Sequence, residues 1–186
     1  MKVKQVISQA LRLAARGDIA DKMDANAQLN DEQNNLRRTF LIYLNAVIDE
    51  LARGYFPLEK VEKMHSPTRE FAFADFSEGP TKIKRVTDGK NPVKWHIYPD
   101  YLHADAENIT VRYEYCPAPF GEDDEFRYPV FAVSERLVEY AMAAEHFLVL
   151  GDAVGSAAWE AKYRDEIELL ILKSNLGGRI PPRRWI

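Results

Sequence analysis

The sequence contains a single cysteine, Cys116, and no apolar run long enough to cross a membrane. One thiol cannot form an intrachain disulfide, so the fold does not require an oxidising compartment and suits a reducing cytoplasm. The opening stretch MKVKQVISQALRLAARGD is basic and partly apolar, but polar residues interrupt it, so we expect no signal-peptide core. We therefore predict a protein that is made and used in aqueous surroundings.

The sequence also lacks an excess of positive charge. It has 25 basic and 29 acidic residues, which gives a formal net charge of −4. This balance provides no electrostatic reason to bind phosphate backbones over a broad surface, so nucleic acid is not predicted as the main partner. Hydrophobic residues make up 46% of the chain and charged residues 29%, a composition typical of a folded globular core.

Residue types that bind metals are present, but not at the spacing of a recurrent metal site. The candidate ligands are His96 and His103, with Asp100, Asp105 and Cys116. If these ligands converged on adjacent strands, the chain would be a small metal-dependent enzyme that uses His96, His103 and Cys116. The spacing favours a solvated sheet face with ordinary histidines, so we predict no metal, no cofactor and no catalytic residue.

Two further stretches resemble binding sites only superficially. The segment GDAVGS, 151–156, has the glycines of a phosphate-binding loop but lacks its lysine and the strand that precedes it, so we predict a turn between two helices. The acidic run from Glu122 to Glu125 lacks the ligand spacing of an EF-hand and is expected to be a solvated loop. Glu145 and His146 are adjacent helix positions that point about 100° apart, so they do not form an acid–base pair.

Apolar residues recur at helical spacing in four segments. The first spans Val3 to Ala14 and is expected to end before Gly17, with a possible helical turn near Ile19. The second starts at the capping pair Asn30 and Gln33 and is closed by Gly54 and Pro57. The third is capped by Ser134 and breaks at 150–151, and the fourth, capped by Asp152 or Ser156, ends near Asn175.

Between 67 and 117 the apolar period changes to two. The alternating sets are Phe71 and Phe73, then Val93, Trp95 and Ile97, and then Ile109, Val111, Tyr113 and Tyr115. Asp88-Gly89 is a hairpin signal between two of these stretches. This pattern predicts a small antiparallel sheet of about four strands.

The predicted fold class is therefore α+β: a bundle of about four α-helices with an inserted antiparallel β-sheet and an extended C-terminal tail. The expected organisation is 1–66 for the N-terminal helices, 67–117 for the β insertion, 118–133 for a loop, 134–175 for the C-terminal helices, and 176–186 for the tail.

The tail GGRIPPRRWI combines a glycine hinge, a stiff Pro-Pro pair, three arginines and Trp185. Burial of Trp185 in a partner would contribute about 5 kcal/mol gross, from roughly 200 Å² at ~25 cal/mol per Å². Ordering ten residues costs more than this, at about 1 kcal/mol or above for each. One tail would bind weakly, so a multivalent partner is favoured. The alternative is a tail that folds back on its own helices.

The chain resembles the head-to-tail connector (adaptor) proteins of tailed bacteriophages, including the tail tubular protein A type. The resemblance rests on RLVEYAMAAEHFLVLGDAVGSAAWEAKYRDEIELL, 136–170, on the following RIPPRRWI, and on the long helix that ends in IDELARGYFPL. It implies a virion structural protein with no enzymatic activity. Copies would form a ring, commonly twelve-fold, below the portal, with C-terminal segments inserted between portal subunits.

The same resemblance implies the location and the partners. The protein would be assembled in the host cytoplasm and reside in the virion neck, in contact with the portal, its own copies and downstream tail or neck proteins. DNA would be passing cargo, which the acidic run would repel, and no membrane would be involved. The implied portal-binding residues are Arg179, Ile180, Arg183, Arg184, Trp185 and Ile186. A cytoplasmic module that binds a peptide along a sheet edge remains another alternative.

Overall fold

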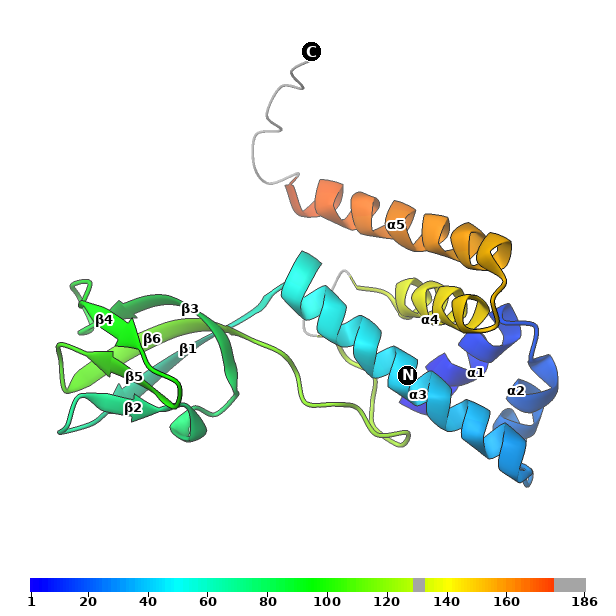
Figure 1. Ribbon diagram of the computed structural model, residues 1–186, viewed down its shortest axis with the longest axis horizontal. Helices are drawn as coiled ribbons and strands as arrows, with labels where there is room; N and C mark the ends of the chain where they lie inside the picture. The colour runs from blue at the N-terminus through cyan, green and yellow to red at the C-terminus, as the bar shows by residue number, and fades with distance from the viewer. Residues whose placement is uncertain (129–132, 176–186) are drawn as a thin grey trace, which may run out of the picture. The chain divides into compact units, whose positions relative to one another are not determined.

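The computed structural model of the protein describes residues 1–128 and 133–175, with side chains to 172 (Figure 1). The described residues form five α-helices and two small antiparallel sheets, so the predicted α+β class is confirmed. The chain divides into two compact units: a helical unit, Met1–Ile48 with Pro119–Ile186, and a β unit, Asp49–Ala118. The β unit is therefore an insertion in the helical unit.

The described part of the helical unit contains one more helix than the sequence predicts. Its helices are α1 (Val3–Leu13), α2 (Gly17–Asp24), α3 (Asp31–Glu50), α4 (Glu135–Val149) and α5 (Ala153–Asn175). The additional helix is α2, for which only a possible turn was expected, because it is short and buries only Ile19 and Ala20. Its apolar signal is therefore weak.

The helix α1 ends before Gly17, as predicted, but Gly17 does not take the left-handed conformation expected of it, because it is the first residue of α2. The residue in the left-handed region is Ala15, with φ of 58°. The amide of Arg16 donates to the Leu11 carbonyl at 2.8 Å, which closes α1 by the hydrogen bond that usually accompanies a left-handed glycine. Here an alanine takes that conformation at a steric cost.

The predicted starts of the long helices are confirmed. The Gln33 amide donates to Asn30 Oδ1 at 2.8 Å and the Asn30 amide donates to Gln33 Oε1 at 3.2 Å, which is a reciprocal capping box. The Leu137 amide donates to Ser134 Oγ at 3.3 Å at the start of α4. The chain leaves α3 through a π-helical turn, Leu51–Tyr55, next to the predicted stop at Gly54 and Pro57.

The core of the helical unit is built around α4, which packs against α1 on one side and α5 on another (Figure 1). Eight of its fifteen residues are buried, and three of them are the small residues Ala141, Ala143 and Ala144. Small side chains let neighbouring helices approach closely. The buried ring of His146 lies 5.2 Å from the ring of Phe40 of α3, centroid to centroid.

The β unit consists of two three-stranded antiparallel sheets with strand orders β1-β6-β3 and β2-β5-β4. The strands are β1 (Leu58–His65), β2 (Glu70–Ala72), β3 (Pro80–Thr87), β4 (Trp95–Ile97), β5 (Tyr101–Ala104) and β6 (Asn108–Tyr115). A short 3-10 turn, Phe73–Asp75, follows β2. The predicted single sheet of about four strands is therefore wrong in both the number of sheets and the number of strands.

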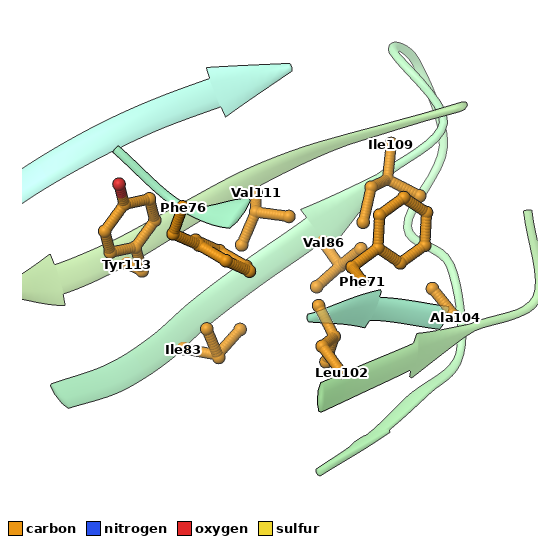
Figure 2. Close-up of a cluster of buried hydrophobic side chains, with 9 residues drawn as sticks. All are labelled: Phe71, Phe76, Ile83, Val86, Leu102, Ala104, Ile109, Val111 and Tyr113. Atoms are coloured by element: carbon orange, nitrogen blue, oxygen red, sulfur yellow. The ribbon is translucent and has the colours of Figure 1, made fainter. Parts of the chain in front are cut away.

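The apolar side chains of both sheets meet in one cluster, which Figure 2 shows. Ile109, Val111 and Tyr113 come from β6, as their predicted alternation requires. The cluster also contains Phe71, Phe76, Ile83, Val86, Leu102 and Ala104. The rings of Phe76 and Tyr113 meet edge to face, with centroids 5.1 Å apart. This cluster gives the inserted unit an apolar core of its own.

The strand β1 lies inside 1–66, the range that the sequence assigned to helices. Its inward positions include Lys60 and Glu62 beside Leu58 and Met64, so no apolar alternation marks it as a strand. Glu62 Oε2 accepts hydrogen bonds from Tyr113 Oη at 2.8 Å and from Ser77 Oγ at 3.0 Å. Hydrogen bonds thus satisfy the carboxylate at a position where apolar residues are usual.

The turn at Asp88-Gly89 is confirmed, but it does not join two strands of one sheet. Gly89 has φ of 100°, and Asp88 Oδ1 accepts from the Asn91 amide at 2.8 Å. After a bridge between Thr87 and Pro92, the chain passes to β4, which pairs with β5 in the other sheet. Ile97 of β4 is exposed, whereas its alternation predicted burial.

Replacement of Ala15 by glycine should stabilise the protein. Glycine takes φ of 58° without the steric cost of a Cβ, which outweighs the added freedom of the unfolded chain. We expect the free energy of unfolding in urea to rise by about 0.5 kcal/mol or more. The matched control is Ala25→Gly, an exposed C-cap with φ of −78°, which should lower it by about 0.5–1 kcal/mol. Equal effects of the two changes would contradict the assignment.

Replacement of Glu62 by glutamine should remove part of the pH dependence of stability. Burial raises the pKa of Glu62, but hydrogen bonds from Tyr113 and Ser77 outweigh burial and hold the pKa below its usual value. As pH falls, Glu62 is therefore protonated in the unfolded state before it is protonated in the folded state. Its contribution to the free energy of unfolding is present above about pH 4.3 and is lost as pH falls through the pKa of Glu62 in the folded state.

Urea unfolding of the native protein and Glu62→Gln at pH 7 and pH 3 measures this effect. The variant should be less stable at pH 7, and the difference should shrink at pH 3. Glu107→Gln, which changes an exposed carboxylate of the same unit, should show little difference at either pH. A constant difference for Glu62→Gln would mean that the carboxylate form is not favoured by folding.

Candidate functional site

The residues that the resemblance assigns to portal binding lie outside the described residues. They are Arg179, Ile180, Arg183, Arg184, Trp185 and Ile186, all beyond Asn175, where α5 ends. Their role remains a prediction. The described part of the chain provides four other places to examine: the histidines of the β unit, Cys116, the acidic run and the surface of α5.

The structure brings His96 and His103 together, but not with Cys116. His96 of β4 is the register partner of His103 of β5, which in turn faces Glu70 of β2. His103 Nε2 lies 3.9 Å from Asp105 Oδ1. Cys116 follows β6 in the other sheet, and within residues 1–128 and 133–175 no group of three His, Cys, Asp or Glu side chains is arranged to hold a metal ion.

Cys116 lies in surroundings that favour the neutral thiol. Burial raises the pKa of the Cys116 thiol, and a hydrogen bond and the charge of Asp49 raise it further, while Arg53 opposes them. Arg53 Nε donates to Asp49 Oδ2 at 2.7 Å, so the cation is already paired with a carboxylate. A raised pKa leaves little thiolate at neutral pH, which is the opposite of what an activated nucleophile requires.

The acidic run is ordered against the start of the chain. The amide of Val3 donates to the Asp124 carbonyl at 2.9 Å and that of Phe126 donates to the Met1 carbonyl at 2.8 Å, around a bridge between Lys2 and Glu125. The prediction of a simple solvated loop is therefore incomplete. The sequence gives no signal for this pairing, because one isolated bridge has no period.

The side chain of Asn45, on α3, forms hydrogen bonds with both the amide and the carbonyl of Phe120, which lies two residues before the acidic run. The Phe120 amide donates to Asn45 Oδ1 at 2.7 Å, and Asn45 Nδ2 donates to the Phe120 carbonyl at 3.1 Å. Glu122 also lies 3.3 Å from Arg37 of α3. The acidic run is thus fixed to the helical unit, while Asp123, Asp124 and Glu125 keep exposed side chains that remain candidates to face DNA.

An open cleft of about 640 Å³ lies beside this loop in the helical unit. Its lining is mainly polar, with Lys4, Gln9, Asn34, Arg37 and Asp123 among the residues that form it. None of the lining residues is His, Cys, Ser, Thr or Tyr. Its charged and amide groups are able to form hydrogen bonds and ion pairs.

His146 is a core residue. Burial lowers the pKa of its imidazole, and the charge of Arg16 lowers it further. Glu145 is exposed while His146 is buried, which agrees with the expectation that these neighbours point in different directions. The neutral ring packs against Phe40 and contributes to the contact between α3 and α4.

Four strongly exposed apolar side chains of the helical unit gather where α4 turns into α5. Leu148, Val149, Leu150 and Val154, which we name the α4–α5 corner, have exposed fractions between 58% and 83%. The prediction that GDAVGS forms a turn between two helices is confirmed: Gly151 has φ of 77°, and the Gly155 amide donates to Asp152 Oδ1 at 2.9 Å.

The helix α5 continues this exposure along its length. Its inner side buries Tyr163, Ile167 and Leu170, yet Leu169 and Leu172 on other sides are about half exposed. The sequence did carry a signal for this, because the run LLIL offers apolar residues to more than one side of a helix. Among the described residues, none buries these outer leucines of α5.

Comparison with protein-family models gives no match for the chain, and comparison with curated proteins gives none either. No helix in the described ranges combines the length and the apolar character that a membrane crossing requires.

Replacement of Asn45 by alanine should loosen the acidic loop. The change removes two hydrogen bonds to the Phe120 backbone, and we expect a loss of about 1–3 kcal/mol in the free energy of unfolding. Amide hydrogen exchange at Phe120 should accelerate. The control is Asn35→Ala on the same helix, where the side chain is exposed and the loss should be a few tenths of a kcal/mol. Unchanged exchange at Phe120 would show that other contacts hold the loop.

Proposed function

We propose that the protein is a structural adaptor of a tailed bacteriophage, which forms a ring below the portal and anchors to it through residues 179–186. The observation that carries the proposal is the order of elements: a helical unit interrupted by a small β unit, and two final helices, α4 and α5, before the cationic segment. The resemblance to the adaptor family is based on the same order and on the residues of these two helices.

The exposed surface of α4 and α5 supports a role in assembly. The α4–α5 corner presents four large apolar side chains to solvent, and exposed apolar clusters of this kind commonly mark protein–protein contacts. The segment 179–186 adds three arginines, Trp185 and two isoleucines, residue types that are enriched or tolerated at the centres of protein interfaces. Several copies around an axis would offset the weak binding of one segment.

The test uses the portal protein encoded in the same genome, mixed with the purified full chain. We expect co-purification and rings in negative-stain microscopy. A chain that ends at Leu176 should keep its circular dichroism and melting temperature and lose portal binding. Loss of fold on truncation would instead support a segment folded back on its own helices.

A charge-matched pair of variants separates specific contacts from general electrostatics. Arg179→Ala/Arg183→Ala/Arg184→Ala should weaken portal binding by at least about tenfold, because arginine contacts at an interface are directional. The control Lys82→Ala/Lys90→Ala/Lys94→Ala removes three exposed cations from the β unit and should change binding less than about twofold. Equal losses, or no portal binding by the native chain, would refute the proposal.

A further inference from the structure

The side of α5 that faces away from α4 carries an apolar stripe that Asp165 and Glu168 interrupt. The apolar residues of this outer face of α5 are Val154, Ala157, Ala158, Ala161, Leu169 and Leu172, all of them exposed. The residues follow helical spacing and lie opposite the buried Tyr163, Ile167 and Leu170. At 1.5 Å per residue the stripe is roughly 27 Å long, and its alanines leave room for another helix to approach closely.

A second, different helix of the same unit exposes a complementary stripe. This outer face of α3 consists of Arg38, Ile42 and Ala46, which are one helical turn apart from each other and exposed. Ile42 is 67% exposed although it lies between the buried Phe40 and Leu44 in the chain. The hydrophobic core explains the other side of α3, but it does not explain an isoleucine here.

The charges on the two faces have opposite sign. Asp165 and Glu168 lie on the outer face of α5, and Arg38 lies on the outer face of α3. None of the ion pairs between described residues involves any of these three side chains. The faces are therefore complementary in apolar character and in charge, which favours contact between them over contact of either face with itself.

We propose that the outer face of α5 in one copy packs against the outer face of α3 in the next copy. Because the two faces differ, the contact is head-to-tail, and each copy has one face left to bind another copy. The inference deepens the proposed function, since it names the subunit contact that a ring would use. A contact of two helices is small, so we expect weak association of the isolated protein that strengthens when copies are held together.

Two double variants test the contact in the full-length chain. Val154→Asp/Leu172→Glu places charge on the outer face of α5, and Ile42→Glu/Ala46→Glu does so on the outer face of α3. All four positions are exposed, so the folds should be retained, which circular dichroism and thermal unfolding check. The control Val61→Glu/Ile97→Glu changes two exposed apolar residues of the β unit, 63% and 56% exposed.

Sedimentation velocity over a concentration series into the millimolar range measures the result. The native protein and the control should show a mass that rises with concentration, while each double variant should remain monomeric. An equimolar mixture of the two variants should form a dimer and nothing larger, because one partner keeps an intact α5 face and the other an intact α3 face. Arg38→Glu should weaken association at low ionic strength and have less effect at high ionic strength.

Three outcomes would overturn the inference. They are a native protein that stays monomeric throughout the series, double variants that associate as the native protein does, and a mixture that remains monomeric although each variant has lost association. The last outcome would indicate a contact that needs both faces of the same copy.

The portal experiment separates this inference from the proposed function. A variant that cannot self-associate still has residues 179–186 and should bind the portal as single copies. Self-association without portal binding would refute the adaptor role alone, and portal binding without self-association would refute the subunit contact alone.

Discussion

The packing of α4 between its neighbours is the contact on which the helical unit depends. Most of α4 is buried, and its alanines allow α1 and α5 to approach from different sides. An apolar helix in the middle of a unit, such as α4, must be covered by other elements on several sides, and α5 covers α4 with one of its faces. The opposite face of α5 carries no charged residue between Val154 and Ala161. The arrangement that completes the core therefore leaves a second apolar surface exposed to solvent.

Four of the five described helices, all except α2, were predictable because their signals are local. The capping pair of Asn30 and Gln33 and the cap at Ser134 lie within one turn of the residues they bind, and Gly151 marks the turn between α4 and α5. The end of α1 was predicted to within a residue, but its left-handed residue was assigned to Gly17 instead of Ala15, because nothing in the sequence distinguishes that alanine from a helical one.

The β unit and the acidic loop were less predictable because they depend on contacts between distant residues. β1 carries Glu62 on its inner side, where a carboxylate is tolerated only because Tyr113 and Ser77, from other parts of the chain, donate hydrogen bonds to it. The two hydrogen bonds between Asn45 and the Phe120 backbone likewise join residues that are far apart in sequence. Patterns of two or 3.6 residues contain no information on such pairs. The surface of α5 lies between these cases: its apolar residues are visible in the sequence, but which of them the core uses is not.

The proposed weak binding of a single segment 179–186 and the proposed contact between the two helix faces would reinforce each other. By the estimate above, one tail of ten residues, 177–186, would gain too little from burial to offset its own ordering. Copies joined through α3 and α5 would carry their segments at fixed spacing, and each bound segment would raise the effective concentration of the next. The order of events then matters: a portal that already presents repeated sites would gather weakly associating copies, and their mutual contacts would add to the affinity of each. A subunit contact of low affinity suits assembly on the portal better than one of high affinity. Copies that associated strongly in the absence of the portal would compete with correct assembly.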